Sequence, residues 1–90
     1  MQVGTLVKLK VPCLGNKIGT KGVCYEVYNL GNHNGASVIF ENGNYDGFGE
    51  DEQEQWLEVI EHSKFKYNFT NVIKLSNDFE NGVFTCILSL

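Results

Sequence analysis

Apolar and polar residues alternate along the first strand that the sequence predicts. In residues 6–11 (LVKLKV) the odd-numbered side chains are apolar, and Lys8 and Lys10 lie between them. A period of two is typical of a half-buried β-strand with one face in water. Pro12 ends this strand, because proline has no N–H for the hydrogen-bond ladder.

The next segment predicts a second strand and then a loop. Residues 20–28 (TKGVCYEVY) are partly apolar on both faces, which indicates a strand covered on both sides or an aromatic binding face. Gly22 within this strand predicts a bulge or a tight bend, as small barrels need at their corners. Residues 29–35 (NLGNHNG) are rich in turn-forming residues and predict an exposed loop.

Residues 36–60 predict a hairpin, a helical turn and a closing strand. Asn42 and Gly43 stand between two apolar runs, a strong hairpin signal because both residue types tolerate positive φ. The acidic residues 50–55 (EDEQEQ) predict one turn of α- or 3₁₀-helix, with carboxylates at its N-terminal end, where they are favourable. Residues 57–61 (LEVIE) predict a short last strand.

Residues 63–90 predict a C-terminal β-hairpin. Phe65, Tyr67 and Phe69 alternate with polar residues, Asn71 interrupts, and Ile73 and Leu75 resume the same parity. Residues 76–82 (SNDFENG) predict a turn, and residues 83–90 (VFTCILSL) predict a second strand. A lone hairpin is marginal in water, and an apolar edge favours association. The hairpin is therefore expected to close one end of the main sheet, or to extend it and mediate a homodimer.

Composition and charge restrict the class of protein. Ten glycines, ten asparagines and one proline in 90 residues indicate many turns, which favours an all-β protein. No membrane span or signal peptide is visible, so we expect a cytoplasmic protein without a membrane partner. Residues 1–24 carry four lysines and no acid, whereas residues 25–63 carry nine acids and no lysine. The absence of arginine and a net charge of −4 argue against an ordinary nucleic-acid binder.

The order of predicted elements resembles an SH3-like barrel over residues 3–61. Within it, residues 19–23 (GTKGV) resemble the glycine-marked second strand of Tudor-like and KOW-type barrels. The chain also resembles small SH3-like proteins of low-GC bacteria, a resemblance that implies a fold and no activity. We therefore predict an all-β fold with a five-stranded SH3-like barrel in residues 1–62 and an additional C-terminal β-hairpin in residues 63–90.

Each resemblance implies a kind of partner. KOW-type modules bind RNA or ribosomal partners, Tudor-like modules hold methylated basic side chains in an aromatic cage, and adaptor SH3 domains dock proline-rich peptides beside acidic loops. The lysines available for the first role are Lys8, Lys10, Lys17 and Lys21. The aromatic and acidic residues available for the other two are Tyr25, Tyr28, Tyr45, Asp46, Phe48, Glu50, Asp51, Glu52 and Trp56.

The candidate binding site is the acidic rim of residues 46–54 with the aromatics around it. Its residues are Tyr25, Tyr45, Asp46, Phe48, Glu50, Asp51, Glu52 and Trp56. Phe48 and Trp56 are also explained as barrel core, because large aromatics are commonly buried. We expect a non-catalytic binding or adaptor module that contacts a peptide or protein, with a nucleic-acid or ribosome-associated module as the alternative.

Catalytic and cofactor motifs are absent from the sequence. Cys13, Cys24 and Cys86 are an odd number without a secretory signal, so we expect buried thiols and no disulfide framework. They lack the close ligand pairs of structural zinc, and residues 46–54 lack the spacing of a calcium loop. No phosphate loop or dinucleotide fingerprint occurs. We predict no enzymatic activity, cofactor or metal.

Overall fold

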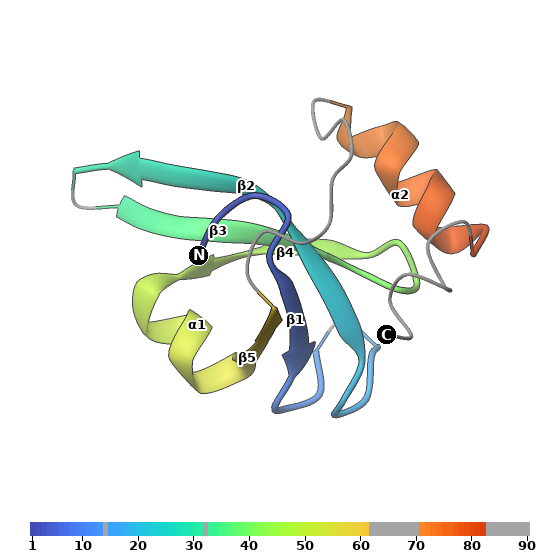
Figure 1. Cartoon of the computed structure of the whole chain (residues 1–90), viewed down its shortest axis with the longest axis horizontal. Coiled ribbons are helices and arrows are strands. Elements are labelled where there is room, and N and C mark those ends of the chain that lie inside the picture. The colour runs from blue at the N-terminus through green and yellow to red at the C-terminus, as the bar shows by residue number, and fades with distance from the viewer. Residues whose placement is uncertain (14, 32, 62–70, 83–90) are drawn as a thin grey trace.

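The computed structural model describes residues 1–13, 15–31, 33–61 and 71–82, where a five-stranded antiparallel sheet carries two short helices (Figure 1). The elements are β1 (Leu6–Leu9), β2 (Lys21–Leu30), β3 (His33–Phe40), β4 (Tyr45–Gly49), α1 (Glu50–Trp56), β5 (Leu57–Glu61) and α2 (Val72–Glu80). The strands lie in the order β4-β3-β2-β1-β5, so β4 and β5 are the edges and the sheet is not closed. This confirms five antiparallel strands, in an arrangement compatible with a small barrel-like fold.

Each face of the sheet buries its own set of apolar side chains. The inner cluster consists of Val7, Leu9, Val38, Phe40, Phe48 and Leu57. The outer cluster consists of Leu6, Val23, Ile39, Leu75 and Phe79. Trp56 at the end of α1 packs against the inner cluster, whereas α2 supplies two members of the outer cluster, so the helices cover opposite sides of the sheet (Figure 1).

A bulge in β2 places two consecutive side chains on the outer face. Cys24 pairs with Val38 and Glu26 pairs with Ser37, so Tyr25 is the extra residue on the β2 side. Tyr25 packs against the outer cluster, and the Ser37 hydroxyl donates to Glu26 Oε1 at 3.2 Å. The bulge therefore lies beyond Gly22, the position that the sequence favoured.

Gly22 allows β2 and β3 to approach closely. A Cβ at this position would lie 2.7 Å from the Ile39 carbonyl oxygen and 2.8 Å from the Phe40 ring. Glycine is therefore required here for lack of space, which is the other common reason for a glycine inside a strand.

The loop predicted for residues 29–35 is wrong, because β2 and β3 continue into it as a paired hairpin. Their ladder extends through Asn29↔Asn34 to Leu30↔His33, which leaves two residues for the turn. Gly31 in that turn has φ 69°. A two-residue turn that contains glycine is a favoured hairpin connection. The extended ladder gives the backbone N–H and C=O groups of these polar residues their hydrogen-bond partners.

The hairpin predicted at Asn42-Gly43 is confirmed. Phe40 N donates to the Asn44 carbonyl at 2.9 Å, Gly43 N donates to the Phe40 carbonyl at 2.8 Å, and Gly43 has φ 85°. These bonds define a three-residue loop whose last residue needs the left-handed conformation. The acidic segment that follows is a helix of seven residues, longer than the single turn predicted.

The strand and turn predicted across residues 72–80 are wrong, because these residues form α2. Asn71 caps the helix by accepting a hydrogen bond from Lys74 N at 3.0 Å, and Leu75 and Phe79, one turn apart, are both buried. Ile73, which the alternating pattern grouped with Leu75, is 71% exposed. The two strands of the predicted C-terminal hairpin fall largely in residues 62–70 and 83–90, outside the described residues. The homodimer expected from this hairpin therefore stays a prediction.

Candidate functional site

Helix α1 is held at both ends by contacts that its sequence explains. Glu52 Oε1 accepts a hydrogen bond from Gly49 N at 3.3 Å, so the third helical residue reaches back to the N-cap. Glu50, Asp51 and Glu52 lie in the first turn, where the helix dipole favours negative charge. At the other end, Lys10 Nζ donates to the Glu54 carbonyl at 2.7 Å. The acidic segment is therefore a fixed helix from which carboxylates project.

A groove of about 440 Å³ lies between α1 and the start of β5. We call it the α1 groove, and it is lined by Met1, Lys10, Glu50, Gln53, Glu54, Leu57, Glu58 and Val59. Leu57 is buried and Val59 is 39% exposed, so apolar and acidic side chains meet in this groove. An apolar surface beside a few polar groups is the usual character of a ligand site.

Carboxylates dominate the charge of the α1 groove. Glu50 and Glu54 are four residues apart on α1 and project from the same side of the helix. Glu58 forms an ion pair with Lys8 across the β1–β5 ladder, with Lys8 Nζ 2.9 Å from Glu58 Oε2. Lys10 is held by the α1 carbonyl described above. The carboxylates of Glu50 and Glu54 have no donor within the described residues and are available to a bound cation.

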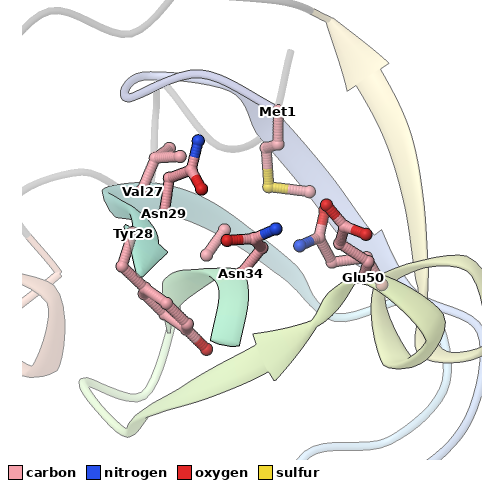
Figure 2. Close-up of a pocket in the computed structure, with 9 residues that line it drawn as sticks. Met1, Val27, Tyr28, Asn29, Asn34 and Glu50 are labelled. Carbon is pink, nitrogen blue, oxygen red and sulfur yellow. The ribbon is translucent and has the colours of Figure 1, made fainter. Parts of the chain in front are cut away.

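A smaller cavity of about 170 Å³ adjoins the α1 groove, near the turn end of the β2–β3 hairpin. We call it the Asn34 pocket. It shares Met1, Glu50 and Gln53 with the α1 groove, and its remaining lining comes from β2 and β3. Figure 2 shows the Asn34 side chain in the middle of this pocket, with Tyr28 on one side and Glu50 on the other. We refer to these two adjoining cavities together as the depression beside α1.

On the outer face, Tyr25 and Tyr45 form an edge-to-face pair. Their ring centroids are 6.0 Å apart with an interplanar angle of 89°, and Tyr45 is 47% exposed. Burial raises the pKa of the Tyr25 phenol, and the carboxylates of Glu26 and Asp46 raise it further, while a hydrogen bond with Ser37 lowers it. The hydroxyl is therefore neutral at physiological pH, and the pair is an aromatic surface with carboxylates close by.

The structure distributes the predicted site residues over three places. Tyr25 and Tyr45 lie together on the outer face, and Asp46 is exposed on the edge strand β4. Phe48 is buried in the inner cluster and Trp56 packs on it, with ring centroids 6.3 Å apart. The remaining three predicted residues, Glu50, Asp51 and Glu52, lie on α1.

Only Glu50 of the predicted residues lines the depression beside α1. Sequence reasoning missed Asn34, whereas Gln53 and Glu54 lie within the predicted acidic rim of residues 46–54 but were not named as site residues. Glu54 carried a usable signal, because it repeats the charge of Glu50 at helical spacing. Asn34 carried none, since it was assigned to a loop.

Two of the four lysines considered for RNA binding are held among acidic segments. Lys8 is paired with Glu58, and Lys10 contacts the C-terminal turn of α1. Lys17 is exposed and Lys21 is half-buried. Lys8 and Lys10 therefore do not stand apart from the acids.

The thiols in the described part of the chain are protonated at neutral pH. Burial raises the pKa of Cys24 to about 11, and it raises the pKa of the half-buried Cys13. A nucleophilic cysteine needs a lowered pKa. Within the described residues, no three His, Cys, Asp or Glu side chains are grouped to hold a metal ion. Cys86 lies outside the described residues.

These features define a small, predominantly β protein with two short helices. Neither helix in the described part of the chain is long and apolar enough to span a membrane. No protein family, curated protein or solved structure matches this chain.

Proposed function

We propose that this protein is a non-catalytic binding module that holds a basic segment of a peptide or protein in the α1 groove. The observation that carries this proposal is the position of Glu50 and Glu54, whose carboxylates project from one side of α1 into a groove with apolar residues beside them. The net charge of −4 adds a long-range attraction for basic partners.

The chemistry of the groove matches lysine and arginine side chains. Their aliphatic stems would lie on Leu57 and Val59, and their charged ends would reach the carboxylates. Binding of a segment without covalent change is the simplest use of such a surface.

The arrangement of elements supports a second part of the proposal, an SH3-like barrel. A single helix separates β4 from β5, and β5 returns to pair with β1 at the far edge of the sheet. This is the chain order and strand pairing that the resemblance implies. A Tudor-like or KOW-type origin would be a narrower assignment within the same proposal.

A binding measurement with matched charge variants tests the proposed function. A fluorescent peptide that alternates lysine with small residues is titrated with the full chain, and Glu54→Gln is compared with Asp51→Asn. Asp51 is on the same helix but lines neither cavity. We expect Glu54→Gln to weaken binding about threefold to fivefold, in the range of one exposed ion pair, and Asp51→Asn to leave it nearly unchanged.

Three outcomes would contradict the proposed function. The lysine peptide could fail to bind at low salt, both variants could weaken it equally, or single-stranded RNA could bind more tightly than the peptide. Equal weakening would indicate nonspecific attraction to net charge. Tight RNA binding that falls steeply with salt would favour the nucleic-acid alternative through Lys8, Lys10, Lys17 and Lys21.

A further inference from the structure

The Asn34 pocket contains a buried acceptor that no group in the described part of the chain satisfies. Asn34 Oδ1 is buried and has no hydrogen-bond donor within the described residues. A buried polar atom without a partner is uncommon in folded proteins and loses free energy relative to water. Gln53 on α1, which also lines the pocket, donates from Nε2 to the Phe48 carbonyl at 3.1 Å and makes no hydrogen bond to Asn34 Oδ1. The pocket therefore presents an acceptor that is ready for a donor from outside.

The position of Asn34 follows from the unexpected length of the β2–β3 hairpin. Asn34 pairs directly with Asn29, so both side chains lie on one face of the two strands. Ala36, two residues further along β3, shares this face and pairs with the buried Phe48. Val27 and Ala36 line the pocket together. The acceptor is thus fixed on a rigid ladder beside an apolar wall.

The charge at the mouth of the pocket narrows the chemistry of its ligand. Glu50 lines both the Asn34 pocket and the α1 groove, and no donor contacts its carboxylate within the described residues. A neutral hydroxyl could satisfy Asn34 Oδ1 but would gain little from Glu50. A cation that carries several N–H groups can serve both, and it can place an aliphatic stem against Val27 and Ala36.

Size restricts the ligand further. The pocket holds about 170 Å³, whereas pockets for drug-sized ligands hold roughly 300–1,000 Å³. A single side chain is therefore the appropriate occupant. We propose that the Asn34 pocket binds one guanidinium or ammonium side chain, and that it anchors the basic segment whose remainder lies in the α1 groove. This inference rests on the proposed function for the identity of the partner, but the pocket can be tested by itself.

Small probes test the pocket without any peptide. The ¹⁵N-labelled full chain is titrated with N-acetyl-argininamide and N-acetyl-lysinamide, and with N-acetyl-citrullinamide, which keeps the shape of arginine without its charge. We expect at least one cation to shift the Asn34 side-chain amide and the backbone signals of residues 34–36 and 50–53. Citrullinamide is expected to bind at least tenfold more weakly. Equal binding of citrullinamide, or shifts confined to Tyr25 and Tyr45, would overturn the inference.

Two substitutions at residue 34 separate binding from folding. Asn34→Leu removes the acceptor at similar size, and we expect it to abolish binding of the cationic probes. Asn34→Asp keeps an acceptor and adds charge, and we expect it to tighten binding at least threefold. Asp51→Asn is the matched control, and it should leave the binding of both cationic probes unchanged. A gain in Asn34→Asp cannot arise from damage to the fold, so its absence would count against the pocket.

The two proposals fail in different ways. If the lysine peptide binds and depends on Glu54, but Asn34→Leu affects neither the peptide nor the probes, the pocket inference is wrong and the proposed function stands. If the probes bind at Asn34 but the peptide does not bind, the proposed function is wrong and the pocket stands.

Discussion

The Ser76 hydroxyl donates a hydrogen bond to the Gly43 carbonyl at 2.6 Å and so joins α2 to the β3–β4 turn, 33 residues away in the chain. A Cβ at residue 43 would lie 2.6 Å from the Ser76 carbonyl oxygen, and Gly43 has φ 85°. Glycine is therefore required at residue 43 for two reasons: the turn needs a positive φ there, and α2 leaves no room for a Cβ. The turn sets the register of the hairpin and also provides the surface on which α2 docks.

Substitutions at this contact should lower stability by different amounts. We expect Ser76→Ala to lower the free energy of unfolding by about 1 kcal/mol, the usual net value of one hydrogen bond. Gly43→Ala should cost more, because it adds a collision with α2 to the roughly 1–2 kcal/mol of a left-handed alanine. Gly19→Ala is the control, since Gly19 has φ 89° but nothing within 4 Å of its Cβ position. Urea unfolding measures all three, and an equal cost at Gly43 and Gly19 would show that the helix does not press on the turn.

Helix α2 should stabilise the sheet through one of its faces only. Leu75 is fully buried in the outer cluster, whereas Ile73 on the same helix is 71% exposed. We expect Leu75→Ala to cost about 2–5 kcal/mol because it leaves a cavity, and Ile73→Ala to stay within about 0.5 kcal/mol. Chemical unfolding of the full chain measures both. Similar costs for the two variants would mean that α2 does not pack as described.

The close approach of β2 and β3 at Gly22 gives a third prediction. A methyl group there would meet the Ile39 carbonyl oxygen at 2.7 Å, and backbone atoms cannot move aside cheaply. Gly22→Ala should therefore destabilise the protein by about 1–3 kcal/mol through overpacking. At Gly47, in β4, the nearest atom would be the Tyr28 hydroxyl oxygen at 3.3 Å. Gly47→Ala is thus a matched strand control. In thermal unfolding, its melting temperature should stay near that of the parent, whereas that of Gly22→Ala should fall.

Much of the sheet could be predicted from the sequence because its signals are local. The alternation around Lys8 marks a strand, and Asn42-Gly43 marks a turn, without reference to the rest of the chain. Helix α2 could not be predicted in this way, because Ile73 and Leu75 fit a strand as well as a helix. The packing of Leu75 and Phe79 on Val23 and Ile39 decides between them, and that contact is tertiary.

The candidate site was predictable only in its acidic part. Glu50 belongs to a run of carboxylates that any composition scan detects, and the structure places it beside two cavities. Asn34 enters the site because β2 and β3 continue pairing through residues that resemble a loop, and Gln53 enters because α1 is longer than one turn. Neither length is encoded by a strong local signal. The pocket therefore arises from the register of the hairpin and its position beside the helix.

The buried Cys24 thiol should make stability fall at alkaline pH. Burial raises its pKa from 9.0 to about 11, so the folded state retains the proton more strongly than the unfolded state. The stabilisation is fully present below pH 9 and is lost as the pH rises through 11, because the unfolded chain releases the proton first. We expect this residue to lower the free energy of unfolding by about 1 kcal/mol between pH 8 and pH 10. Urea unfolding at these two pH values compares the parent with Cys24→Ala, which removes the titrating group. Other titrating groups contribute to both proteins, so the difference between the two slopes isolates Cys24, and parallel slopes would show that the thiol is not buried as described.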